Sequence, residues 1–409
     1  MQRKLSNFTN QKSETSEKTM KKINLLFSGL ILLSLMLSGY QCSSAEMSSA
    51  KLYIQQKNWD KATESLNKEI AKNPNSDEAY YWLGIVCQEK DDIKGMAENF
   101  KKSLEISQQF RSNIDQITQS KWAESFNAGV GFYNKAAQSK SKDSTTMYLD
   151  KSLEKFNDAI FLEPDSIEAY KIVSMIYLNK GEDDNAVPVL EKIIDKHGSD
   201  FAYIQLADIY QKKGDASASA YKSSKNAADS VNAHNLYLKA LDISKKGLNA
   251  HPGNESILQN LASIYAALNQ TEEGAALFES EVKKNPKSKT ARLYFGIFLT
   301  NVQNYTGAVA EFAEVLSLDP QFSDAYYYES FAYYNWGLTI LKSAEKNNKD
   351  GREEAKPKFE LCIENAKKYN DSEKGSKEKR GYDLLFKAYS RLSMTKEAEE
   401  VQKILENWK

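Results

Sequence analysis

The sequence predicts an all-α protein made of about nine helix pairs, and three observations predict it. Bulky and small residues recur with a period of 34 residues over most of the chain. Only seven prolines and eighteen glycines interrupt the 409 residues. All seven prolines fall at two of the 34 repeat positions. One helix pair per repeat, with prolines near the helix ends, explains this pattern.

Small residues set the register of the repeats. Units that start near residues 43, 77, 122, 167, 200, 255, 289, 323 and 379 place small residues at position 8 and at position 20. Eight of the nine residues at each position are small, and the exceptions are Phe386 and Met96. Small side chains let two helix backbones approach closely. The two positions therefore mark the crossing of the first helix of each repeat, helix A, with the second, helix B.

The prolines support the same register independently. Five of them occupy position 32, where helix B must end before the next repeat begins: Pro74, Pro164, Pro252, Pro286 and Pro320. Pro188 and Pro357 both occupy position 22, near the start of helix B.

Three repeats have a longer connection between helix A and helix B. The additional residues lie at about 137–149, 215–235 and 342–354, and the flanking residues keep a helical period. We therefore expect three lengthened helix pairs rather than long loops. Two further segments, 111–121 and 370–378, interrupt the register between repeats.

The register resembles the tetratricopeptide repeat (TPR). In that family positions 4, 7, 11 and 24 are bulky, positions 8 and 20 are small, and position 32 is proline. The repeat starting at residue 255 shows the pattern at Leu258, Leu261, Ala262, Tyr265, Gly274, Phe278 and Pro286. The resemblance covers residues 43–409. It implies a right-handed superhelix, an α-solenoid, in which helix A lines a concave groove.

Positions 2, 5, 9, 12 and 13 of helix A line the groove in TPR proteins. The candidate binding residues at these positions are Tyr81, Phe126, Tyr133, Asn134, Met175, Asn179, Asn301, Tyr327, Phe331, Tyr334 and Asn335. Asparagine at position 13 offers both a donor and an acceptor to an extended peptide, and aromatic rings supply contact area. Two alternatives remain open. The same residues would serve for packing against the lengthened helices, or Tyr327 and Tyr334 would hold a glycan or small ligand.

Residues 1–42 predict an N-terminal extension followed by a signal peptide. Met20 is the more natural start, because two lysines and an uncharged run at 23–37 follow it directly. At about 1.5 Å per residue this run spans about 22 Å, less than the roughly 30 Å of a membrane core.

Cys42, just beyond the apolar run, resembles the lipidated cysteine of bacterial lipoproteins. Gln41 departs from that pattern, because a small residue usually precedes the cysteine. Cleavage after Ala45 and an uncleaved anchor are the alternatives. We expect export to the cell envelope, with lipidated Cys42 as a membrane tether and the repeats facing the periplasm or the cell surface.

Charge and composition argue against several function classes. The net charge of −1 includes no basic excess of the kind that nucleic acid demands. Three cysteines and three histidines lack the spacing of a metal site, and no catalytic or cofactor motif is present. The sequence therefore predicts a non-catalytic scaffold or assembly factor that binds an unidentified protein or peptide.

Overall fold

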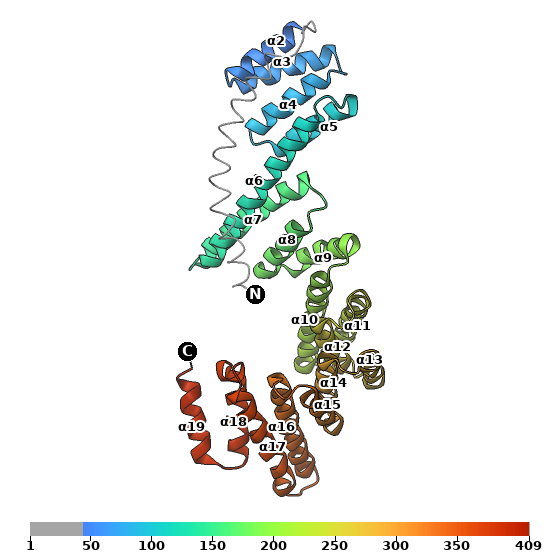
Figure 1. Cartoon of the computed structure of the whole chain (residues 1–409), viewed down its shortest axis with the longest axis vertical. Helices are drawn as coiled ribbons and strands as arrows, with labels where there is room; N and C mark the ends of the chain where they lie inside the picture. The colour runs from blue at the N-terminus through green and yellow to red at the C-terminus, as the bar shows by residue number, and fades with distance from the viewer. Residues whose placement is uncertain (1–43, 409) are drawn as a thin grey trace. The chain divides into compact units, whose positions relative to one another are not determined.

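The computed structural model describes residues 44–408, and these form eighteen α-helices and one short 3-10 helix without a β-strand (Figure 1). The helices follow one another as nine pairs, three of them long, which confirms the predicted fold class. The chain divides into two compact units between Glu124 and Ser125, within α6. None of the helices between residues 44 and 408 combines the length and the apolarity needed to cross a membrane.

The first unit contains the first two pairs and the beginning of the third. Its helices are α2 (Ala45–Gln55), α3 (Trp59–Lys72), α4 (Asp77–Glu89), α5 (Ile93–Ile106) and the first part of α6 (Arg111–Gln138). Segment 111–121, which interrupts the repeat register, is helical and extends α6 toward its N-terminus. Ile114 anchors it, since this side chain is buried.

The second unit contains the remaining repeats. Its helices are the rest of α6, α7 (Lys142–Leu162), α8 (Ile167–Lys180), α9 (Asp183–His197), α10 (Asp200–Ser224), α11 (Ala227–Ala250), α12 (Glu255–Ala267), α13 (Thr271–Lys284), α14 (Lys289–Asn301), α15 (Tyr305–Leu318), α16 (Ser323–Lys346), α17 (Arg352–Asp371), α18 (Lys379–Arg391) and α19 (Thr395–Glu406). The 3-10 helix η1 (Gly375–Lys377) lies in the second interruption, between α17 and α18.

In several helix pairs, helix A and helix B cross where a glycine meets an aromatic ring. A Cβ atom added to Gly296 of α14 would lie 2.5 Å from the ring of Phe312 in α15. In α6, a Cβ atom on Gly129 would lie 2.9 Å from the ring of Phe156. In these repeats position 8 is therefore small because the aromatic side chain at position 24 occupies the space beside it.

The lengthened pairs are α6–α7, α10–α11 and α16–α17. Their helices have 20 to 28 residues, whereas helices of the other pairs have 11 to 15. In α10–α11 the ring of Tyr237 lies against Gly214, and its hydroxyl donates a hydrogen bond to Asp215 at 2.6 Å. Near the tip, the amide of Asn232 donates to Ser217 Oγ at 2.8 Å.

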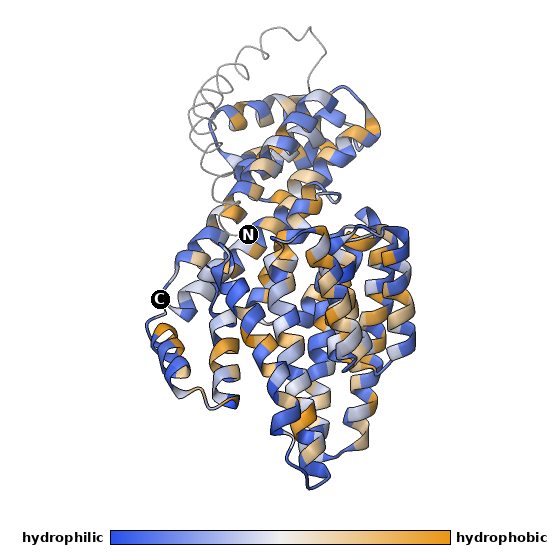
Figure 2. Ribbon diagram, turned by 60° about the horizontal axis from the view of Figure 1, so that its bottom comes forward, coloured by the Kyte–Doolittle hydropathy of each residue, from blue (hydrophilic) through white to orange (hydrophobic). Residues whose placement is uncertain are grey.

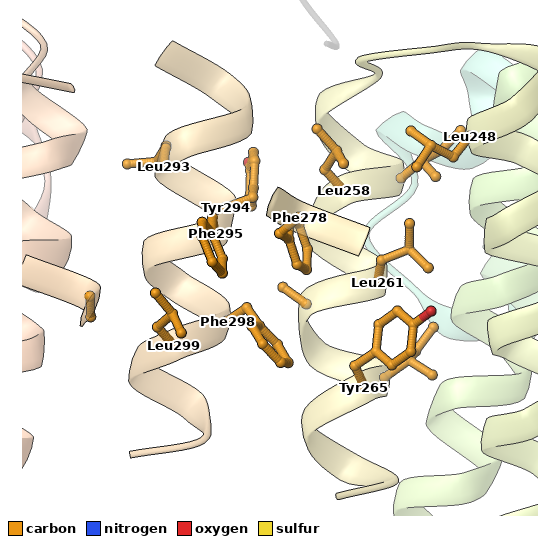
Figure 3. Packing of buried hydrophobic residues seen from close by; sticks show 14 of the residues in the cluster. Leu248, Leu258, Leu261, Tyr265, Phe278, Leu293, Tyr294, Phe295, Phe298 and Leu299 are labelled. Atoms are coloured by element: carbon orange, nitrogen blue, oxygen red, sulfur yellow. The ribbon is translucent and has the colours of Figure 1, made fainter. Parts of the chain in front are cut away.

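The largest core cluster runs through consecutive repeats of the second unit. Phe278 of α13 stacks on Phe298 and Phe295 of α14, at 5.4 and 6.0 Å between ring centroids (Figure 3). Tyr265 of α12 meets Phe298 edge-on at 6.4 Å. Apolar and polar residues alternate along the helices (Figure 2), as expected when one face of each helix packs on its neighbours.

Candidate interaction surface on the first helices

The first helices of successive repeats lie side by side in the second unit. Helices α10, α12, α14, α16 and α18 each contact the next of the series. Two hydrogen bonds link their beginnings, from Asn254 Nδ2 to Asp200 at 3.2 Å and from the Tyr294 hydroxyl to Glu255 at 3.1 Å. Positions 2, 5, 9, 12 and 13 of these helices therefore form one continuous surface, which we call the helix-A face.

Tyr81 is the one candidate in the first unit, and its ring is buried. It stacks on Phe110 with 4.3 Å between ring centroids and an interplanar angle of 7°. Burial raises the pKa of its hydroxyl. The structure therefore places Tyr81 in the packing of this unit.

The candidates of α6 and α8 come together in the second unit. The amide nitrogen of Asn179 donates a hydrogen bond to the Tyr133 hydroxyl at 3.0 Å. Phe126 lies edge-on to the buried ring of Phe156 at 5.3 Å. Asn134 is exposed and Met175 is half-buried.

The asparagines of α14 and α16 differ in their surroundings. Asn301, at the end of α14, is exposed. Asn335 is half-buried, and its amide nitrogen donates to the backbone carbonyl of Phe331 at 2.9 Å. Asn335 Oδ1 thus remains the side-chain acceptor that a peptide would use.

Tyr327 and Tyr334 are half-buried by packing. The guanidinium of Arg380 in α18 lies 4.2 Å from the centroid of Tyr327, and the ring of Tyr369 packs beside it at 5.3 Å. Burial raises the pKa of the Tyr327 hydroxyl. Tyr334 lies edge-on to the buried ring of Phe359 at 5.6 Å.

Phe331 is the exposed member of the aromatic group on α16. Its side chain is 37% exposed, and its ring stacks on Tyr327 with 6.4 Å between centroids. Tyr327, which is itself packed, therefore supports an aromatic ring that faces solvent.

Arg380 is a residue that the sequence reasoning missed. It donates a hydrogen bond to Asp324 at 2.6 Å and pairs with Glu378 at 2.6 Å. Arg380 and Asp324 both occupy position 2 of helix A, in the last two repeats. Opposite charges at one groove position of consecutive repeats were the signal that could have found this pair.

Two surface hollows occur at the C-terminal end of the described chain. One is lined by Lys377, Lys403, Ile404, Asn407 and Trp408, and the other by Glu360, Ile363, Glu364, Lys367, Lys368, Asp371, Leu392 and Met394. Neither includes Tyr327 or Tyr334. Within residues 44–408, no group of three or more His, Cys, Asp or Glu side chains is placed to hold a metal ion.

Comparison with known protein families supports the reading of the helix pairs as repeats. Residues 77–110 and 260–328 match models of the tetratricopeptide repeat. The chain is a tetratricopeptide repeat protein.

Among curated proteins, this TPR chain is similar to the BBSome complex member BBS4 homolog of Drosophila melanogaster. The two are 18% identical over 296 residues, which are 71% of this chain and 52% of the relative. The chain thus spans about half the length of that relative.

Several solved structures are similar to the TPR chain. A tetratricopeptide repeat protein from Parabacteroides merdae is 16% identical, with a TM-score of 0.45, covering 71% of this chain and 93% of that one. PilW, described as a type IV pilus biogenesis factor, is 17% identical, with a TM-score of 0.36 and coverages of 58% and 91%. YrrB, described as having an unusual peptide-binding site, is 20% identical, with a TM-score of 0.31 and coverages of 52% and 93%.

Proposed function

We propose that this protein is a non-catalytic scaffold or assembly factor of the bacterial cell envelope that binds protein partners on its helix-A face. The TPR fold is consistent with a protein–protein interaction scaffold. The signal-like N-terminus supports the location, and Cys42, which lies outside the described residues, would carry the lipid tether.

The exposed ring of Phe331 is the observation that carries the proposal. Aromatic side chains dominate protein interfaces because they bury a large area with few rotatable bonds. Phe331 occupies position 9 of helix A, and Asn301 and Asn335 occupy position 13 of the two neighbouring repeats. An aromatic anchor beside two amides suits an extended peptide, whose backbone needs both donors and acceptors.

The test is a Phe331→Ser substitution in the native cell, followed by crosslinking and mass spectrometry. We expect the substituted protein to lose its crosslinked partners. Its stability should change by no more than about 0.5 kcal/mol, as is usual for a surface position. Leu318→Ser is the matched control, because Leu318 is similarly exposed (40%) but lies in α15, a helix B. Partners that survive Phe331→Ser unchanged would contradict the proposal.

The double substitution Tyr327→Ser, Tyr334→Ser separates binding from packing on the same helix. Both rings contact buried aromatic residues, so we expect a clear fall in melting temperature, corresponding to about 2–4 kcal/mol. Unchanged melting would mean that the two tyrosines do not support α17 and α18.

A further inference from the structure

Two basic side chains of the last repeat lie on the helix-A face without a counter-ion. Lys387 and Arg391 occupy positions 9 and 13 of α18, and both are exposed. Leu385 and Tyr389, on the other side of this helix, are buried, so the two cations project away from the core. Neither forms an ion pair with any residue between 44 and 408. Because like charges four residues apart on a helix repel each other, an anion beside them would stabilise α18.

The other charged groups on this part of the face are in different surroundings. Arg380 pairs with Asp324 and with Glu378, both at 2.6 Å. Asp383 is half-buried, one turn before Lys387. At the face positions of α18, unpaired positive charge is thus confined to the second half of the helix.

The register of α16 and α18 places the exposed Phe331 beside these cations. The Arg380 guanidinium donates to Asp324 at 2.6 Å, and both residues occupy position 2 of their helices. Further along α16, Tyr334 packs against the core cluster that α17, α18 and α19 build. The two first helices therefore run side by side in the same direction. Phe331 and Lys387 each lie seven residues beyond the hydrogen-bonded pair, about 10 Å along their helices, and are level with each other.

The spacing of the three groups fits an extended acidic chain. Side chains four apart on a helix have Cβ atoms about 5–6 Å apart. Alternate side chains of an extended chain point to one side, about 6.6 Å apart. Two carboxylates separated by one residue therefore match Lys387 and Arg391. Adjacent helices pack about 8–10 Å apart, so the same segment reaches Phe331 within roughly three residues.

We propose that the helix-A face of α16 and α18 binds an acidic segment of a partner protein. An apolar side chain of the segment packs on the ring of Phe331, and two carboxylates at alternate positions pair with Lys387 and Arg391. Asp383 repels a further acid at its own level, so the residue opposite it is neutral. The proposal rests on the proposed function, since it names the chemistry of a partner on the same surface.

A protein segment fits this surface better than a nucleic acid does. Nucleic-acid binding depends on a basic patch that neutralises many phosphates. Here two cations stand next to the acid Asp383, in a chain with a net charge of −1. A short acidic pair beside an apolar anchor requires no more positive charge than that.

The test uses the full chain and peptides of roughly ten residues in a serine and alanine background. Each carries one leucine as the anchor and, three residues away, Glu-Ser-Glu, Gln-Ser-Gln or Lys-Ser-Lys, and each is made in both orders. Affinity is measured by titration calorimetry at low salt. We expect the Glu peptide to bind about tenfold more tightly than the Gln peptide, because two ion pairs are gained, and the Lys peptide to bind more weakly still. At about 1 M salt the Glu and Gln peptides should bind alike, since exposed charges are then screened.

Charge reversal makes the outcome specific. Lys387→Glu combined with Arg391→Glu should invert the preference, so that the Lys peptide binds most tightly, a gain that misfolding cannot imitate. Lys396→Glu combined with Lys403→Glu is the matched control, because these exposed lysines belong to α19, a helix B, and the net charge changes equally. The control should keep the preference for Glu.

Three results would overturn the acidic segment: equal binding of the three peptides at low salt, no binding of any peptide, or a preference for Glu that survives the charge reversal. An oligothymidylate that binds through Lys387 and Arg391 while the Glu peptide does not would make the occupant a nucleic acid. Dimers of the chain, detected by sedimentation and dissociated by the charge reversal, would make it a second copy.

The proposed function is decided separately by the Phe331→Ser crosslinking experiment. Native partners lost with that substitution, together with equal binding of the three peptides, would preserve the scaffold and overturn only the acidic segment.

Discussion

Single glycines at position 8 hold helix A and helix B of a repeat together because they leave room for an aromatic ring. Phe312 is fully buried, and its ring fills the space that a side chain on Gly296 would need. The contact joins the two helices of one repeat, so its loss would separate helix A from helix B. The stability of a repeat thus depends on a residue that has no side chain.

Gly296→Leu should destabilise the second unit by overpacking. The added side chain would force Phe312 or the α15 backbone to move, at a cost on the order of 1–3 kcal/mol or more. Thermal melting measures the effect. Gly131→Leu is the control: a Cβ on this glycine of α6 would meet nothing within 4 Å, so helix propensity should make that change neutral or slightly stabilising. Equal melting of both variants would refute the register at position 8.

Glu329 is a second residue whose environment controls stability. Its carboxyl group is half-buried between α16 and α17, and burial is the main cause that raises its pKa to about 7. Lys368 lowers this pKa and Glu364 raises it, and the two form a hydrogen bond with each other at 2.7 Å. The charged form of Glu329 is thus the unfavourable one.

The consequence is a stability that falls as pH rises. A group whose folded pKa is raised stabilises the fold fully below its ordinary value of 4.5, and this contribution is lost by about pH 7. The loss is at most about 3 kcal/mol, since one pKa unit corresponds to about 1.4 kcal/mol. Glu329→Gln should therefore melt higher than the natural protein at pH 8 and similarly at pH 4.5. The control Glu314→Gln, at an exposed position, should show no such difference. If the melting temperature of Glu329→Gln changed with pH just as that of the natural protein does, the raised pKa of Glu329 would be refuted.

The long hairpins are the elements that depart most from a regular repeat. Three large apolar side chains in the outer part of the α10–α11 hairpin are exposed: Tyr221 (38%), Val231 (60%) and Leu238 (38%). Hydrogen bonds from Asn232 to Ser217 and from Ser224 to Asp229, at 2.8 and 2.9 Å, link the two helices in this region. Few buried contacts mean that the tip can open without disturbing the rest of the array.

Hydrogen exchange should resolve this difference within one helix. We expect the amides of 216–224 in α10 to exchange faster than those of 203–210, which lie in the part of the helix that contributes buried Leu206, Ala207 and Ile209. Mass spectrometry of peptic fragments measures both segments in the same sample. Equal protection along α10 would mean that the hairpin tip packs against something further.

At the scale of the whole molecule, equivalent ion pairs recur between successive repeats. Acidic residues at position 18 pair with lysines at position 14 of the next repeat, as in Asp60–Lys90 and Asp150–Lys180, at 3.0 and 2.8 Å. Between α15 and α16, Tyr305 at position 17 instead stacks on Trp336 at position 14, with 6.1 Å between ring centroids. Each repeat is thus fixed by its neighbours, which is typical of a solenoid.

The lipoprotein interpretation of the N-terminus makes a prediction about Cys42. Because the apolar run before it is too short to span a membrane, we expect metabolic fatty-acid labelling to mark the protein. Cys42→Ala should abolish the label and either release the protein from the membrane or leave its precursor uncleaved. Cys362→Ala is the control, since that thiol is fully buried in α17. A label that survives Cys42→Ala would overturn the lipoprotein interpretation.

The sequence by itself determined the helix pairs, their order and the three long hairpins, because these depend on local spacing. Prolines at helix ends, small residues at helix crossings and a continuous apolar period act within one repeat. The same reasoning selected a face of helix A, but it could not rank the residues on that face. Phe331, Tyr327 and Tyr334 carry the same signal in the sequence, an aromatic residue at a groove position.

Only the tertiary structure decided which of them faces solvent, because exposure depends on residues that other elements bring alongside. Arg380 and Tyr369 cover Tyr327, Phe359 supports Tyr334, and Phe331 is left open. Spacing along a helix specifies which residues share a face, whereas the stacking of repeats specifies what each of them touches.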